Sequence, residues 1–283
     1  MCASAFPCKN PNYPDRPATT GKTLPFRRLW RGMPRPAPLP QLSVCRTVIW
    51  QAAIKNRQFT MAPEDMIQPG TLPPDGGAQT GLMATTLDSR YTQTSGRVFL
   101  NGTQALVRLM LDQARCDAAA GLSTGGMASG YRGSPLAALD QELWRANRHL
   151  DAHAIEFIPA VNEDMAATII AGTQQAEGQP ATTVDGVFSL WYGKGPGVDR
   201  SIDAIKHGNA YGSSPHGGVL MVAGDDHGCV SSTIAHQSEL SLMSASVPVI
   251  HPASIADILS FGMFGFAMSR YSGLWTGFKT ASE

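Results

Sequence analysis

Apolar side chains recur at helical spacing in several parts of the chain. The clearest example begins at Thr103 and ends at Gly121, and its apolar positions, separated by three or four residues, are Val107, Met110, Leu111 and Ala114. Similar spacing predicts further helices, which open at Pro135 and at Glu163, extend over Val198–Asn209, lie around Ser232–Ser244 and run from Ala256 to Arg270.

Short, nearly continuous apolar runs lie between these helices and read as buried strands. They are Thr124–Tyr131, Ile155–Pro159, Gly186–Tyr192, Val219–Ala223, Val247–Ile250 and Trp275–Lys279. Strands that alternate with helices at this spacing imply a mostly parallel sheet. Because the strands are apolar at almost every position, we expect helices to cover both faces of the sheet. The predicted fold class is therefore α/β, with a doubly wound sheet.

Polar, glycine-rich loops follow four of the predicted strands. They are Tyr131–Pro135, Val161–Asp164, Tyr192–Gly197 and Gly224–His227. Parallel strands all end on the same side of a sheet, so these loops should converge on one rim, where open α/β folds bind ligands. We therefore expect a composite ligand site there.

The second of these loops carries the residue around which the site is predicted. Asn162 is a good helix N-cap, and it puts Glu163 in the first helical turn just beyond a strand. One interpretation is that the Glu163 carboxylate only complements the helix dipole. The other is that it faces a ligand at the carboxyl edge of the sheet.

Other motifs suggest chemistry less specifically. The GKGPG segment favours phosphate binding through amides at a helix N-terminus and Lys194, but it matches neither the P-loop nor the dinucleotide fingerprint. Gly121–Gly125 fits G-x-S-x-G, yet Ser123 follows a helix and precedes a strand, which is the reverse of a nucleophile elbow.

Histidine and carboxylate residues do not form a predicted metal site. Asp225, Asp226 and His227 are adjacent, and adjacent side chains rarely reach one ion, so loop hydrogen bonds are the better interpretation. His236 and His251 are assigned no role, and the sequence predicts no metal-binding residues.

Charge divides the chain into two parts. Residues 1–60 carry ten basic side chains and one acid, so the remaining 12 basic and 21 acidic residues give the rest of the chain a net charge of −9. An acidic body argues against nucleic acid as its partner. No stretch of about twenty apolar residues occurs, which argues against a membrane span.

The basic, proline-rich leader has three interpretations. It is a transit peptide, a disordered arm that touches nucleic acid, or non-native sequence upstream of a true start at Met61 or Met66. We favour the third, and we treat residues 1–85 as leader and linker. The body holds Cys116 and Cys229 and no C-x-x-C motif, which suits a reducing cytoplasm.

Taken together, the loops resemble a known family. YRGSPL, NEDMAATIIAGTQQA, WYGKGPGVDRS, HGGVLMVAGDDHGCVSST and HQSE are similar to indolepyruvate:ferredoxin oxidoreductase in its large, fused bacterial form. The resemblance begins at about Thr86 and continues to the last residue, so residues 86–283 are expected to be the pyrimidine-binding domain of a thiamine diphosphate enzyme, truncated at its C-terminus.

The resemblance also implies roles for individual residues. Glu163 would hydrogen-bond the aminopyrimidine ring nitrogen of thiamine diphosphate and thereby activate the cofactor, while Ser134 and Arg132 would bind the substrate. Cofactor contacts are expected beside Glu163, at Asn162, Gly193, Lys194 and Gly195.

The reaction that the resemblance implies is oxidative decarboxylation of an arylpyruvate with coenzyme A and ferredoxin. The elements that would hold Mg²⁺, the diphosphate and a [4Fe–4S] cluster are not found, so a missing domain or second subunit should supply them, and the fragment should be inactive alone. Two alternatives stay open: another thiamine-dependent 2-oxoacid decarboxylase or oxidoreductase, and a truncated assembly module without catalysis.

Overall fold

Successive side chains of the central strands point to opposite faces of the sheet, and both faces are buried. The structure is a computed structural model that describes residues 86–95, 97–132, 136 and 138–281. In β3 (Val187–Lys194), Leu190 and Tyr192 face one side of the sheet and Trp191 faces the other. All seven residues of β4 (Val219–Asp225) are buried. Both faces must therefore be covered, and helices cover them.

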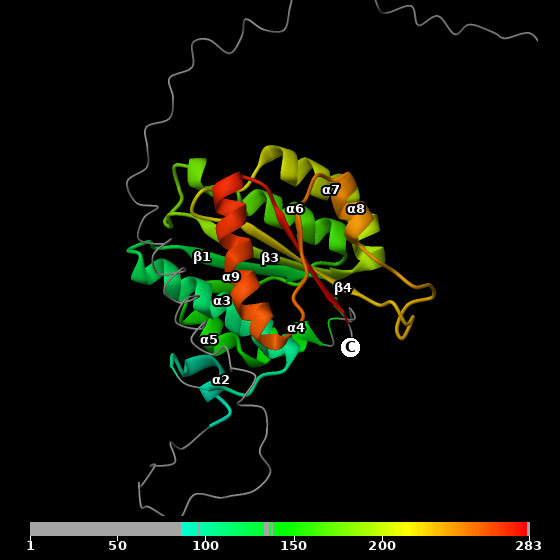
Figure 1. Cartoon of the computed structure of the whole chain (residues 1–283). Coiled ribbons are helices and arrows are strands. Elements are labelled where there is room, and N and C mark those ends of the chain that lie inside the picture. Colours follow the sequence, from blue (N-terminus) through cyan, green and yellow to red (C-terminus); the bar gives the residue numbers. More distant parts are fainter. Residues whose placement is uncertain (1–85, 96, 133–135, 137, 282–283) are drawn as a thin grey trace, which may run out of the picture. The chain divides into compact units, whose positions relative to one another are not determined.

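The described strands form one parallel sheet in the order β2-β1-β3-β4-β6-β5. The remaining strands are β1 (Gly125–Gly130), β2 (Ile155–Phe157), β5 (Val249–Ile250) and β6 (Thr276–Ala281). Figure 1 shows helices on both sides of this sheet. The predicted α/β, doubly wound fold is confirmed.

Each connection between strands follows from the right-handed crossover rule. Connections that advance toward β4 and β5 pass over one face through α6 (Glu163–Thr173), α7 (Gly195–Tyr211) and α8 (Glu239–Ser244). Connections that step back pass over the other face, and they use α4 (Leu139–Arg145), α5 (Asn147–Asp151) and α9 (Ile255–Ser272). α3 (Gly102–Ala119) packs beside α9 on this second face.

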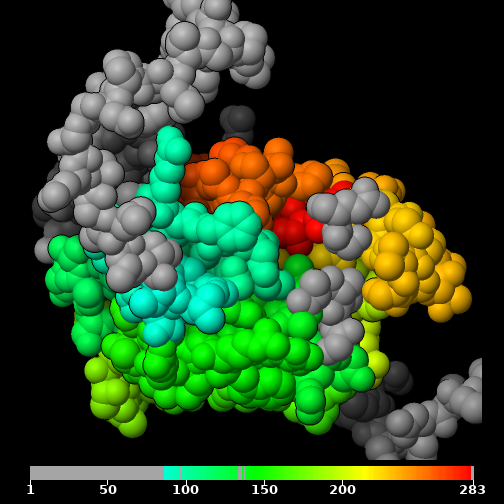
Figure 2. Space-filling view, turned by 90° about the horizontal axis from the view of Figure 1, so that it is seen from below, coloured from blue at the N-terminus to red at the C-terminus, as the bar shows by residue number. Residues whose placement is uncertain are grey.

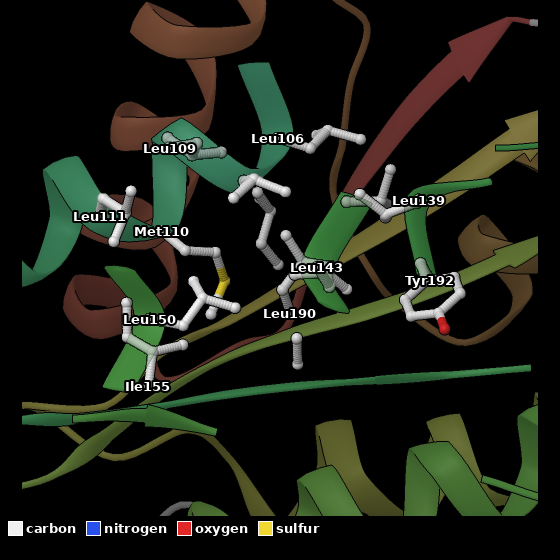
Figure 3. Packing of buried hydrophobic residues seen from close by; sticks show 14 of the residues in the cluster. Leu106, Leu109, Met110, Leu111, Leu139, Leu143, Leu150, Ile155, Leu190 and Tyr192 are labelled. Atoms are coloured by element: carbon white, nitrogen blue, oxygen red, sulfur yellow. The ribbon is translucent and has the colours of Figure 1, made fainter. Parts of the chain in front are cut away.

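Two hydrophobic cores follow from this arrangement, one on each face. The core under α3, α4 and α9 contains residues from the helices and from β3, and Figure 3 shows Leu106, Met110, Leu139, Leu190 and Tyr192 among them. The core under α6 and α7 is built around Trp191, Ile170 and Trp275. No helix in the described part of the chain is both long and apolar enough to cross a membrane.

The first described residues form a short helix, α2 (Ser89–Thr92), which the apolar spacing did not predict and in which Tyr91 is only 4% exposed. Arg108 of α3 holds this segment, because its guanidinium donates to the main-chain oxygens of Arg90 and Gln93 at 2.7 and 2.8 Å.

Two predicted helices are shorter than expected. The helix predicted from Pro135 begins at Leu139, since Ala138 adopts the left-handed conformation (φ 65°), and Pro135 lies outside the described residues. The helix predicted around Ser232–Ser244 begins only at Glu239. The preceding amide of Ser238 donates to the Asp225 carboxylate rather than to a helical carbonyl.

A third difference concerns the GKGPG segment, which is no loop. β3 continues through Lys194 and α7 begins at the next residue, Gly195. The strand therefore leads directly into the helix, and the GKGPG segment forms the helix N-terminus on which the phosphate-binding interpretation depends, so that interpretation stays a prediction.

Candidate functional site

The loops after β1, β2 and β4 and the junction of β3 with α7 lie at one edge of the sheet, because all the strands are parallel. At this edge the chain leaves β1 toward the face of α4, whereas it leaves the neighbouring strand β3 toward the face of α7. Adjacent strands with diverging connections open a crevice, which is where doubly wound sheets bind ligands. Glu163 begins α6 beside this crevice.

Two hydrogen bonds fix the backbone around Glu163. The Asn162 side chain caps α6 by accepting from the Met165 amide at 2.8 Å. The Trp191 indole, fully buried in β3, donates to the main-chain oxygen of Glu163 at 3.0 Å. The start of α6 is therefore attached to the sheet, and the first Glu163 side-chain atoms have little freedom to move.

Two glycines shape the space that the Glu163 side chain occupies. A Cβ added to Gly197 would lie 2.7 Å from Cγ and 2.8 Å from Oε1 of Glu163, and one added to Gly193 would lie 3.3 Å from Cγ. Any side chain at Gly197 would thus collide with the carboxylate. Gly197 is also in the first turn of α7, so the carboxylate rests against a second helix N-terminus, where negative charge is favourable.

The Glu163 carboxylate has acceptor capacity to spare. Among the residues that the structure describes, none donates a hydrogen bond to it or forms an ion pair with it. The residue is half-buried, so it is still partly accessible to solvent. An ionised carboxylate accepts several hydrogen bonds. The arrangement therefore suits a ligand that presents an N–H group at the rim.

The neighbouring glycine and lysine serve the protein's own structure. A Cβ on Gly195 would lie 2.5 Å from Cβ of His236, so this glycine allows the imidazole to pack on the first turn of α7. Nδ1 of His236 lies 3.6 Å from Oδ2 of Asp199. Nζ of Lys194 donates to the main-chain oxygen of Ser231 at 2.7 Å. Cofactor contacts by Lys194 and Gly195 stay predictions.

Asp225 and Asp226 hold the long loop between β4 and α8. Asp225 is fully buried and accepts from the amide and the hydroxyl of Ser238 at 2.8 and 2.5 Å, with Nζ of Lys279 at 3.5 Å. Asp226 accepts from the Ser231 and Val230 amides, each at 2.8 Å, and these bonds lower the pKa of Asp226. The predicted loop hydrogen bonds are confirmed.

Lys279 also binds Glu239, the first residue of α8. The hydrogen bond from Lys279 lowers the pKa of Glu239. Asp225, Lys279 and Glu239 thus form an ion cluster between β4, β6 and α8. In the described part of the chain, no group of three or more His, Cys, Asp and Glu side chains could hold a metal ion.

The predicted substrate residues lie after β1. Ser134 is outside the described residues. Arg132 is 70% exposed in its side chain, its Nε lies 3.9 Å from Oδ2 of the buried Asp140, and its guanidinium lies 5.1 Å from the centre of the Trp144 ring. The Tyr192 hydroxyl is buried and has no hydrogen-bond partner among the described residues, and burial raises the pKa of Tyr192. Arg132 thus lies at the surface with Asp140 and Trp144 as its neighbours, and its contact with a substrate stays a prediction.

The sequence did not single out Gly197 or His236, although both shape the site. Gly197 was visible as part of GKGPG, but nothing in the sequence says that Glu163 lies against it. His236 is 41 positions from Gly195, so only the fold brings the two together.

Comparisons with known proteins give one similarity of fold. Neither the protein-family models nor the curated proteins include a match to this sequence. Among solved structures, the chain is similar to a 2-oxoglutarate:ferredoxin oxidoreductase from Magnetococcus marinus, solved with 2-oxoglutarate, coenzyme A and succinyl-CoA bound. The identity is 15% and the TM-score 0.48, over 65% of this chain and 29% of the other. The chain thus spans under a third of that neighbour's length.

Proposed function

We propose that residues 86–283 are the aminopyrimidine-binding part of a thiamine diphosphate-dependent 2-oxoacid oxidoreductase, with Glu163 as the residue that activates the cofactor. The enzyme would act with ferredoxin and coenzyme A, and its substrate would be an arylpyruvate such as indolepyruvate. The observation that carries this proposal is the Glu163 carboxylate, which is fixed against Gly197 at the rim of the sheet and has no partner among the described residues.

The hydrogen-bond acceptor and the space at Glu163 fit an aminopyrimidine ring. Such a ring presents a nitrogen that donates when protonated, and Glu163 is an acceptor without a donor. Gly193 and Gly197 leave space around the carboxylate that a Cβ would fill. Thiamine diphosphate, when bound, supplies a nucleophilic carbon for attack on the keto group and a sink for the electrons released with carbon dioxide.

The part of this chain in the reaction would be to hold a proton. Glu163 would keep the protonated ring nitrogen in place by a hydrogen bond to a charged group, which is worth about 1.5–3 kcal/mol. Asn162 and Trp191 would act through Glu163, since they fix its backbone. Arg132 would bind the substrate carboxylate, because guanidinium matches that group in shape and charge. A further domain or second subunit would hold the diphosphate.

The test compares two acids in the same helical turn. Glu163 and Asp164 both lie in the first turn of α6, but only Glu163 lies against Gly193 and Gly197. We expect thiamine diphosphate to shift the amide signals of Gly193 and Gly197 in an NMR titration of the 283-residue chain. Glu163→Gln should weaken this binding at least tenfold, whereas Asp164→Asn should leave it within about twofold.

Two results would contradict the proposal. One is a wild-type chain whose signals do not move at millimolar thiamine diphosphate. The other is equal binding by the Glu163→Gln and Asp164→Asn chains, which would mean that Glu163 only complements the helix dipole.

A further inference from the structure

A cavity of about 640 Å³ opens at the same edge of the sheet, but on the face opposite Glu163. It lies between the first turns of α3 and α9, above the ends of β4 and β6, and we call it the α3–α9 pocket. Its walls include Gly102, Leu106, Gly224, Ile258 and Ala281. Figure 2 looks onto this side, where the red end of β6 is recessed between the orange α9 and the blue-green α3. The volume is in the range that holds a small organic ligand.

The walls of the pocket are largely apolar. The apolar side chains of the walls come from the loops and from both helices. They are those of Leu106, Leu136, Pro252, Ala253, Ile255 and Ile258. No lysine, arginine, aspartate or glutamate is among the described residues that line it, and His251 is the one ionisable side chain of that set. Such a cavity favours an uncharged, apolar group, since a carboxylate buried without a cation carries a large desolvation penalty.

Most polar side chains of the pocket are already bonded within the protein. The Asn101 side chain accepts from the amide of Gln104 and the hydroxyl of Thr103, each at 2.9 Å. The Ser254 hydroxyl accepts from the Asp257 amide at 3.1 Å, and the Thr280 hydroxyl donates to the Ala223 oxygen at 3.3 Å. These polar groups therefore already have hydrogen-bond partners in the protein, and a ligand would mainly contact carbon atoms.

Strand register brings this pocket close to Glu163. Gly193 lies beside the Glu163 side chain, and it pairs with Ala223 of the adjacent strand β4. The next residue of β4, Gly224, lines the pocket. Neighbouring strands are about 4.8 Å apart, so the Glu163 side chain and the pocket lie beside adjacent strands at the same edge of the sheet.

We propose that the α3–α9 pocket receives the side chain of the 2-oxoacid substrate. This inference rests on the proposed function, in which the keto carbon reacts near Glu163. The apolar lining then selects an aryl or large alkyl side chain. It disfavours a second carboxylate such as that of 2-oxoglutarate, because the described lining offers no lysine or arginine to pair with it.

Two alanines near the start of α9 provide a matched test. Ala253 lines the pocket, whereas Ala256, also exposed, does not. Phenylpyruvate and 2-oxoglutarate serve as probes, titrated into the 283-residue chain with thiamine diphosphate present and followed by NMR at Gly102, Gly224 and Ile258. We expect phenylpyruvate to bind at least tenfold more tightly than 2-oxoglutarate. Ala253→Trp should weaken phenylpyruvate at least tenfold, while Ala256→Trp should leave it within twofold.

The outcomes separate this inference from the proposed function. It is overturned if the two tryptophan variants bind phenylpyruvate alike, if 2-oxoglutarate binds as tightly as phenylpyruvate, or if phenylpyruvate moves none of the pocket signals. The binding of thiamine diphosphate to the Glu163→Gln chain reports on the proposed function alone, because Glu163 lies on the other face of the sheet. Circular dichroism checks that both tryptophan variants fold.

Discussion

Two carboxylates lie at the same edge of the sheet, and their surroundings differ in every respect that bears on function. Asp225, at the end of β4, is fully buried, accepts two hydrogen bonds from Ser238 and lies 3.5 Å from Nζ of Lys279. Glu163, just after β2, is half-buried and has no donor among the described residues. The oxygens of Asp225 are thus occupied by hydrogen bonds that join the loop to the sheet. The oxygens of Glu163 accept no hydrogen bond from the described residues.

The difference shows how the two roles can be told apart without a ligand. A structural carboxylate collects its donors from the protein, because an unpaired buried charge is costly. A ligand-binding carboxylate is fixed through its backbone and through close packing, while its oxygens stay unpaired. Under the proposed function, Trp191 and Gly197 supply that kind of support to Glu163. Changing Lys279, the partner of Asp225, should therefore affect the stability of the fold. Changing Gly197, which packs against Glu163, should affect ligand binding.

Lys279→Met should have the largest effect on stability. Lys279 is 4% exposed, and its removal leaves the buried Asp225 with no ion-pair partner among the described residues. Breaking a buried pair in this way costs about 3–5 kcal/mol. Urea unfolding of the wild type and the variant measures the difference. Lys206→Met, on the exposed surface of α7, is the control and should stay within about 0.5 kcal/mol. Equal stability of the two variants would show that the Asp225 cluster is not structural.

Gly197→Ala should affect binding rather than folding. Alanine is favoured over glycine in a helix by about 1 kcal/mol, but its Cβ would lie 2.8 Å from Oε1 of Glu163 and push the carboxylate aside. We expect the affinity for thiamine diphosphate to fall about tenfold, which is about 1.4 kcal/mol, while the domain stays folded.

Gly172→Ala is the matched control for that change. Gly172 is also helical, in α6, and a Cβ there would meet nothing within 4 Å. This substitution should raise the free energy of unfolding by about 0.5–1 kcal/mol and leave binding unchanged. If Gly197→Ala binds as well as Gly172→Ala, the position of the carboxylate does not depend on the glycine.

The sequence predicts a structural feature well when the residues that form it are close together along the chain. The apolar runs that became β3 and β4 were predicted because their pattern is local, and the N-cap at Asn162 was found for the same reason. The start of α7 was misplaced, since glycine and proline usually mark a loop. Here Gly195 and Gly197 are small because His236 and Glu163 pack against them.

The loop after β4 shows the same limit. Helical spacing around Ser232–Ser244 is real, but two carboxylates, four to thirteen positions from the amides they bind, decide the conformation before Glu239. Asp225 takes the Ser238 amide and Asp226 takes those of Val230 and Ser231. The α3–α9 pocket was likewise invisible, because its walls come from the starts of α3 and α9 and the ends of β4 and β6.

Acid should loosen the loop at Asp226. The main-chain bonds from Ser231 and Val230 lower the pKa of Asp226, so the folded state holds its proton less tightly than the unfolded chain does. The stabilisation is therefore complete above the ordinary aspartate pKa of about 3.9 and is lost as the pH falls through the lower, folded value. The Val230 and Ser231 amide signals should titrate with a midpoint below about 3.9. A midpoint above that value would mean that the bonds do not persist in solution.

Glu163→Gln should have the smallest effect on stability, and this is the sharpest form of the comparison. No described residue donates to the Glu163 carboxylate, so the amide loses no protein contact, and Gln is nearly the same size. The free energy of unfolding should therefore fall by no more than about 1 kcal/mol, from the loss of negative charge at the helix N-termini, even though thiamine diphosphate binding falls at least tenfold. Urea unfolding of this variant beside Lys279→Met gives the answer. A loss above about 1 kcal/mol for Glu163→Gln would place the residue with Asp225, as part of the structure of the rim, because a carboxylate kept free for a ligand contributes little to folding.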